Sequence, residues 1–112
     1  MFEKPKNILK AYVKKNNIKC CYCGRTFTHR FPMSIDHLIS KMNGGGYGID
    51  NIVVSCIKCN SVFKKNMNID KFLLKFPQFK KCFRVYMKKL AKLEIRGILY
   101  IDAIKWVKKY LK

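Results

Sequence analysis

Two cysteine pairs of identical spacing carry the clearest chemistry in the sequence. They are Cys20-x-x-Cys23 and Cys56-x-x-Cys59. Two such pairs in one short chain are typical of a four-thiolate zinc site, in which the metal holds two loops together. Three disulfides among the six cysteines are the alternative. Residues 1–19 lack the apolar stretch of an export signal, so we expect thiolates in a reducing compartment.

Two cysteines remain outside these pairs. Cys21 adjoins the first pair and could compete as a ligand, but the x-x spacing favours Cys20. Cys82 lies on an apolar stripe of an expected helix, which predicts a buried packing role.

A second possible site lies between the pairs, where Asp36 and His37 are adjacent. A carboxylate offers hard oxygen ligation to a cation such as Mg²⁺ or Mn²⁺, and a neutral imidazole can take a proton from water near neutral pH. Asn60, directly after the second pair, supplies another oxygen ligand. This set predicts metal-assisted phosphodiester cleavage, in which the cation neutralises charge on the phosphate. Zinc would then be structural, and the second cation catalytic.

Short elements must position these groups, and the patterns predict an α+β fold. We expect a basic helix over residues 7–15, strands over 34–38 and 52–54, and a helix from about Ile57 to Lys65. Gly24 is expected to take a positive φ in the turn behind the first pair. The glycine-rich run 43–48 predicts a flexible loop.

The C-terminal third is predicted to be helical. Asn68 is the expected N-cap of a helix that Pro77 ends. A second helix runs from Phe79 to Leu93, with an apolar stripe at three- and four-residue steps. Gly97 breaks it, and a last amphipathic helix covers residues 100–111.

The charge balance predicts a polyanionic partner. The 112 residues include 25 Lys and Arg against 6 Asp and Glu, a formal net charge of +19. Nucleic acids and acidic membrane surfaces are the common partners of such a field, and no apolar run is long enough to span a membrane. We therefore expect nucleic acid as the partner and no membrane; double-stranded DNA is the partner that the resemblance described next implies. The candidate contact residues are Arg30, Lys64, Lys65, Lys80, Lys81, Arg84 and Lys88.

Five motifs in this order resemble the HNH endonucleases, over about residues 18–66. They are CCYCG (20–24), SIDHL (34–38), GGG (44–46), DNIV (50–53) and CIKCN (56–60). The resemblance implies a ββα-metal core with His37 as general base and Asp36 and Asn60 as ligands of the catalytic cation. Asn51 would hold the loop between the strands and orient the base, with a turn cap as its alternative role. The four paired cysteines match the zinc-binding subset of the family.

Two positions depart from the family pattern. Ser40 stands where many members have proline. A lysine commonly follows the last motif residue by three, but that position is Phe63, and Lys64 and Lys65 are displaced.

The prediction is one domain over residues 1–112, with a core at about 18–66 and a helical extension over about 67–112. Its predicted function is that of a metal-dependent DNA endonuclease, intracellular and not secreted, acting as a monomer or weak homodimer. The alternative is a non-catalytic, zinc-stabilised nucleic-acid-binding module.

Overall fold

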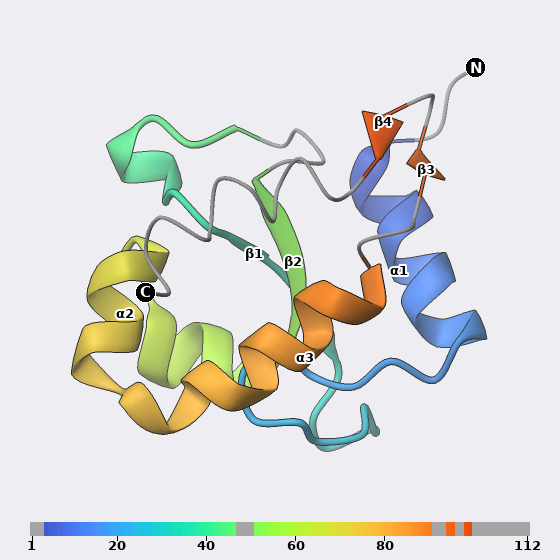
Figure 1. The fold of residues 1–112 in the computed structure, drawn as a ribbon, viewed down its shortest axis with the longest axis horizontal. Helices are drawn as coiled ribbons and strands as arrows, with labels where there is room; N and C mark the ends of the chain where they lie inside the picture. Colours follow the sequence, from blue (N-terminus) through green and yellow to red (C-terminus); the bar gives the residue numbers. More distant parts are fainter. Residues whose placement is uncertain (1–3, 47–50, 91–93, 96–97, 100–112) are drawn as a thin grey trace.

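A two-stranded antiparallel hairpin forms the centre of the molecule (Figure 1). The computed structural model describes residues 4–46, 51–90, 94–95 and 98–99. In chain order its main elements are α1 (Pro5–Lys15), β1 (Met33–His37), η1 (Lys41–Asn43), β2 (Ile52–Cys56), η2 (Cys59–Lys64), α2 (Ile69–Lys75), η3 (Pro77–Phe79) and α3 (Lys80–Leu90). Figure 1 shows α1 on one side of the hairpin, η2 and α2 on the other, and α3 running between these two groups.

The register of the hairpin places the two predicted sites at its opposite ends. Met33 pairs with Cys56 at one end, and His37 pairs with Ile52 at the other. At mid-strand, the Val54 N–H donates to the Tyr86 hydroxyl of α3 at 3.0 Å, and the Val54 carbonyl accepts from the Cys21 N–H at 3.2 Å. Both faces and the outer edge of β2 are therefore covered, and all five of its residues are buried.

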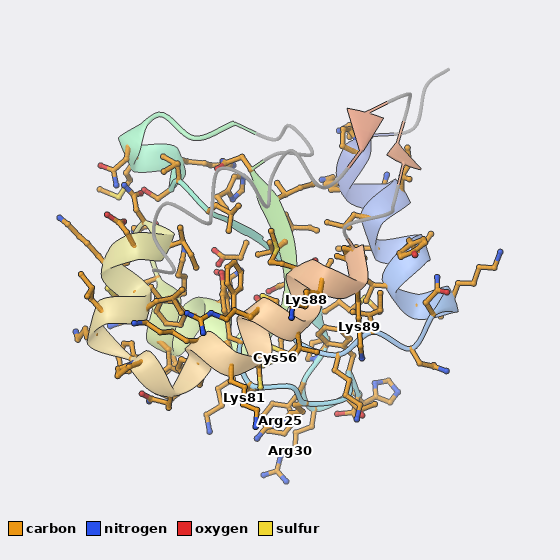
Figure 2. All side chains as sticks on the ribbon, viewed as in Figure 1. Arg25, Arg30, Cys56, Lys81, Lys88 and Lys89 are labelled. Atoms are coloured by element: carbon orange, nitrogen blue, oxygen red, sulfur yellow. The ribbon has the colours of Figure 1, made fainter. Side chains whose placement is uncertain are left out.

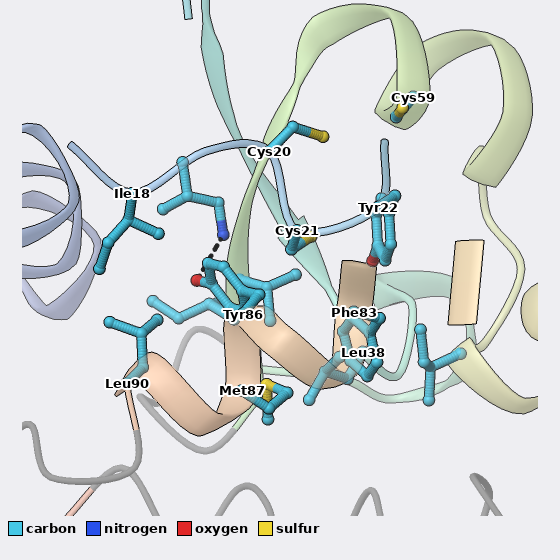
Figure 3. Packing of buried hydrophobic residues seen from close by; sticks show 14 of the residues in the cluster. Ile18, Cys20, Cys21, Tyr22, Leu38, Cys59, Phe83, Tyr86, Met87 and Leu90 are labelled. Atoms are coloured by element: carbon cyan, nitrogen blue, oxygen red, sulfur yellow. Dashed lines mark hydrogen bonds between the residues drawn. The ribbon is translucent and has the colours of Figure 1, made fainter. Parts of the chain in front are cut away.

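The hydrophobic core joins the hairpin to α1, α2 and α3 (Figure 3). Tyr22 packs edge-on against Phe72 of α2, with 4.8 Å between ring centroids, and stacks on Phe83 of α3 at 5.7 Å. The buried face of α3 consists of Phe83, Tyr86, Met87 and Leu90, at three- and four-residue steps. The predicted α+β class is thus confirmed, and α2 and α3 pack onto the core.

The predicted elements before residue 67 are present, with shifted ends. Gly24 has φ +74°, which confirms the expected turn behind the first cysteine pair. The helix after the second pair is the exception in geometry. From Cys59 to Lys64 it is a π-helical turn, in which the Lys65 N–H donates to the Asn60 carbonyl at 2.8 Å.

Of the helix predicted over Phe79–Leu93, the structure describes the part up to Leu90, and residues 91–93 lie outside the described residues. A 3₁₀ turn precedes α3, which ends at Leu90, and residues 94–95 and 98–99 pair as two short strands, β3 (Glu94–Ile95) and β4 (Ile98–Leu99). The last helix, predicted over residues 100–111, lies outside the described residues. In the parts that are described, no helix combines the length and the apolar character that crossing a membrane needs.

Candidate active site and metal centre

The four paired cysteines meet at the end of the hairpin that contains Cys56. The Sγ atoms of Cys20, Cys23, Cys56 and Cys59 all lie within 4.8 Å of one another, and those of Cys23 and Cys56 are 3.9 Å apart. A tetrahedral zinc with Zn–S bonds of about 2.3 Å separates its sulfurs by about 3.8 Å. The cluster therefore fits one structural metal ion such as zinc, and these would be its four ligands.

The loops around this cluster stabilise negative charge on sulfur. The Cys56 N–H donates to the Cys20 Sγ at 3.2 Å. Hydrogen bonds from Cys21 and Cys59 lower the pKa of Cys20 well below its ordinary value, whereas burial raises the pKa of Cys23 to about 11. Cys20 is thus the sulfur of this cluster that loses its proton most readily, and Cys23 holds its proton more tightly. Metal binding would have to release those protons, so the affinity for zinc should fall as the pH falls.

The two remaining cysteines lie beside the cluster. Cys21 is completely buried behind Cys20, and burial raises its pKa. Cys82 is half-buried on α3 and faces Gly24, since a Cβ atom on that glycine would lie 3.2 Å from the Cys82 sulfur. It is therefore less buried than the packing role predicted for it.

Asp36 is buried, and both oxygens of its carboxylate bind groups of the chain. Only 4% of its surface is exposed. One oxygen accepts from the Tyr22 hydroxyl and lies 3.3 Å from the Lys64 ammonium. The other accepts from the backbone N–H of His37 at 2.9 Å and from Lys64 at 3.4 Å. Three hydrogen bonds and an ion pair thus engage a group with about four lone-pair sites, so groups of the chain compete with the expected metal for Asp36.

Lys64 supplies the cation that this carboxylate needs. It is 0% exposed, and besides Asp36 it donates to the His37 carbonyl at 2.8 Å. Burial raises the pKa of Asp36 and lowers the pKa of Lys64, and the charge of each partner opposes these shifts. Lys64 is thus inaccessible to nucleic acid, and its prediction as a contact residue was wrong.

The π-helical turn explains how Lys64 reaches this position. Lys64 follows Asn60 by four residues, one more than the lysine of the family pattern. Because a π-helical turn contains more residues than an α-helical one, Asn60 and Lys64 can both face β1. The Asn60 amide donates to the Ser34 hydroxyl at 3.0 Å and to the Ile35 carbonyl at 3.1 Å. Its amide nitrogen is therefore committed to the strand, next to the expected site.

His37 lies at the end of β1, next to the buried pair. It is half-buried, and its pKa is lowered mainly by burial, with the charges of Lys41 and Lys64 acting in the same direction and Asp36 acting against them. The imidazole is therefore neutral at pH 7, the form that accepts a proton. Lys41, exposed on η1, is a neighbouring cation that the sequence pattern did not single out.

Asn51 braces the segment that follows His37. Its side-chain oxygen accepts from the Ile39 N–H at 2.8 Å, and its amide donates to the carbonyls of Ile39 at 3.0 Å and Gly46 at 2.9 Å. Gly45 fits beneath this amide only because it lacks a side chain, since a Cβ there would lie 1.7 Å from the Ile39 oxygen. The glycine run is thus a packed turn at that position, where a flexible loop was predicted.

The serine in place of proline has a use in this turn. The Ser40 N–H donates to the Asn68 side-chain oxygen at 3.0 Å, and the Ser40 hydroxyl accepts from the Asn43 amide at 2.8 Å. Proline has no N–H to donate. Asn68 occupies the predicted N-cap position of α2, but its side chain binds this turn and makes no cap hydrogen bond.

The remaining predicted contact residues lie on the surface. Lys80 is half-buried, and the exposed ones are Arg30, Lys65, Lys81, Arg84 and Lys88. Of these, Figure 2 labels Arg30, Lys81 and Lys88.

Comparison with known proteins supports the motif assignment. The pattern of the HNH endonuclease family matches residues 20–75, a span that contains both cysteine pairs, Asp36, His37 and Asn60 and ends with α2. No curated protein and no solved structure gives a significant match.

Proposed function

Because the chain belongs to the HNH endonuclease family, we propose that it cleaves DNA, with His37 as the general base. The observation that carries this proposal is the way His37 is held. Its backbone N–H donates to Asp36 at 2.9 Å, and its backbone carbonyl accepts from the buried Lys64 at 2.8 Å. Beyond it, Asn51 binds the backbone of Ile39 on both sides. These bonds fix the backbone that carries the His37 ring, which lowers the entropic cost of positioning the base at a substrate.

In the proposed reaction, a water oxygen attacks the phosphorus of a phosphodiester while His37 accepts the proton of that water. The bond from phosphorus to the leaving sugar oxygen breaks, and that oxygen takes a proton from solvent. Lys41 is the exposed cation near His37 that we propose to contact the phosphate. Zinc on the four cysteines would hold η2, and with it Lys64, against β1.

The resemblance also predicts a catalytic Mg²⁺ or Mn²⁺ on Asp36 and Asn60. The occupied Asp36 carboxylate does not support this site, so no step above uses such a cation. Dependence on either ion stays a prediction for experiment.

The test is nicking of supercoiled plasmid DNA by zinc-loaded protein, with and without added Mg²⁺ or Mn²⁺. His37→Ala should lower the cleavage rate by about 100- to 10,000-fold, the usual contribution of a general base. The matched control is His29→Ala, because His29 is the other histidine of the chain and is exposed. Equal rates for His37→Ala and the parent would refute the assignment of the base.

One observation favours a second candidate, the non-catalytic nucleic-acid-binding module. A buried Asp36 with both oxygens bound by the chain would be equally useful as a structural anchor of the hairpin. If the zinc-loaded parent binds DNA but nicks it under none of these conditions, this candidate replaces the first.

A further inference from the structure

We propose that a groove between the first cysteine pair and α3 binds the phosphodiester backbone of nucleic acid, at a place separate from His37. We call it the knuckle groove. One side is lined by Lys19 and Gly24, which flank the first cysteine pair. The other side is lined by residues of α3, namely Lys81, Cys82, Val85 and Lys89. The inference deepens the proposed function, on which it rests for the choice of nucleic acid as the ligand.

The charge of the groove matches that ligand. Lys19, Lys81 and Lys89 are all exposed, and no acidic residue lines the groove. Within residues 4–46 and 51–90 the acids are Asp36, which is buried against Lys64, and Asp70. Within those two ranges no carboxylate lines the groove, and a polyanion can neutralise its lysines and release its counterions.

The shape of the groove also suits an extended strand. Lys81 and Lys89 are eight residues apart on one face of α3, which separates them by about 12 Å along the helix axis. Val85 lies between them and is 46% exposed. Two cations at this spacing, with an apolar surface between them, can contact different phosphates of one backbone.

A second hollow continues the surface toward α1. It shares Ile18 and Lys19 with the knuckle groove and adds Lys14, Asn17 and Phe27. Lys19 therefore stands at the junction of a track that runs from α3 to α1. The partly buried ring of Phe27 offers an apolar face in that track, of the kind on which bases stack.

The groove is distinct from the site at His37. Its lining contains Cys20, from the metal centre, but none of Asp36, His37 and Asn60. Lys81 and Lys89 also lie beyond residues 20–75, the part that matches the family. Figure 2 labels Lys81 and Lys89, at different points along α3.

The lysines of α3 should therefore differ in importance. Lys81 and Lys89 line the groove, whereas Lys80 and Lys88 do not. Lys81→Gln/Lys89→Gln and Lys80→Gln/Lys88→Gln remove the same charge from the same helix, so the second pair controls for net charge. Both are made in the His37→Ala background, so that a short DNA duplex stays intact and binding is measured independently of cleavage.

The groove pair should weaken binding roughly tenfold and lower the slope of log affinity against log salt by about 2, because two phosphate contacts are lost. The control pair should change both quantities much less. Equal losses for the two pairs would overturn the proposal. Cleavage by the parent is measured in a separate experiment. A failure of the proposed cleavage can therefore be distinguished from a failure of the proposed binding in the groove.

Cys82 provides a direct reporter of occupancy. Cys82 is half-buried, while Cys21 is completely buried, and zinc would occupy the four paired thiols. Alkylation by iodoacetamide should therefore occur at Cys82, and Cys82→Ser should abolish it. Saturating DNA should slow this reaction at least severalfold if the backbone lies in the groove. An unchanged rate at saturation would overturn the proposal.

Discussion

The two ends of the central hairpin solve the same electrostatic problem in different ways. At the end with Cys56, four sulfurs within 4.8 Å of one another need a cation from outside the chain. At the end with His37, the buried carboxylate of Asp36 already has an internal cation, the ammonium of Lys64 at 3.3 Å. Both clusters are buried anionic sites, which are costly unless a counterion pairs with them.

The difference shows why the sequence reveals the site of one cation and not that of the other. Ligands of an external metal lie on tight turns, so their spacing repeats and can be recognised. An internal cation can come from any position that the fold brings close. Here Lys64 lies 28 residues from Asp36 along the chain and depends on a rare π-helical turn for its orientation. The comparison predicts that one end depends on supplied metal and the other on a single lysine.

Removal of the metal should have the largest effect. Structural zinc contributes about 10–16 kcal/mol of apparent binding free energy in small zinc domains, and that free energy is folding free energy. A strong chelator, or Cys59→Ser, should therefore unfold the domain, as measured by circular dichroism and thermal melting. The matched control is Cys82→Ser, which removes a thiol outside the cluster and should melt like the parent. Folded, freshly purified protein with no zinc by elemental analysis would contradict the assignment.

Loss of the internal cation should come second. Lys64→Met leaves the Asp36 carboxylate buried without a counterion, which typically costs about 3–5 kcal/mol. Lys65→Met is the matched control, because its neighbouring side chain is exposed and should change the free energy of unfolding little. Denaturant unfolding of the zinc-loaded variants measures both.

A double variant sharpens this test. Burial raises the pKa of Asp36 and lowers that of Lys64, so both charged forms are costly in this place. Asp36→Leu/Lys64→Met should therefore recover most of the stability that Lys64→Met loses. Additive losses would show that the two groups do not act as a pair.

The same contrast separates what the sequence predicts from what it does not. The cysteine centre, the two strands and the basic helices follow from spacing and periodicity, because those patterns reflect local geometry. The burial of Lys64 does not follow, since a lysine next to Lys65 in a basic chain is usually a surface residue. The occupied carboxylate of Asp36 depends on Tyr22 and Lys64 together, contacts that only the packed hairpin creates. The sequence shows Phe63 at the position where the family pattern has lysine, but it does not show the π-helical turn that directs Lys64 to Asp36.

The glycine turn near His37 should show a smaller effect. Gly45→Ala places a Cβ 1.7 Å from the Ile39 oxygen and 2.8 Å from the Asn51 amide, so the turn must shift, at a cost of about 1–3 kcal/mol. Gly46→Ala is the control, because no atom lies within 4 Å of its added Cβ. Thermal melting compares the two, and amide exchange at Ile39 reports whether the Asn51 brace is lost. Equal melting temperatures would mean that the turn does not need glycine at residue 45.

The smallest effect concerns the charge on His37. Burial, aided by Lys41 and Lys64, lowers its pKa below the ordinary value of 6.5. More than half of the base is therefore neutral at pH 6.5, and cleavage limited by its protonation should fall mainly at lower pH. The unfolded chain binds this proton more readily than the folded one, so the contribution of His37 to stability is present above pH 6.5. It is lost as the pH falls from 6.5 through the folded pKa.

Lys41→Gln should raise the pKa of His37 slightly, because it removes a neighbouring positive charge, and added salt should reduce the difference between parent and variant. NMR titration of the His37 ring in zinc-loaded protein measures the pKa directly, and the pH profile of plasmid nicking should follow the same shift. A His37 pKa above 6.5 in the parent would contradict the half-buried position of the ring. A pKa that Lys41→Gln leaves unchanged would remove Lys41 from the neighbourhood of the base, and with it the proposed phosphate contact.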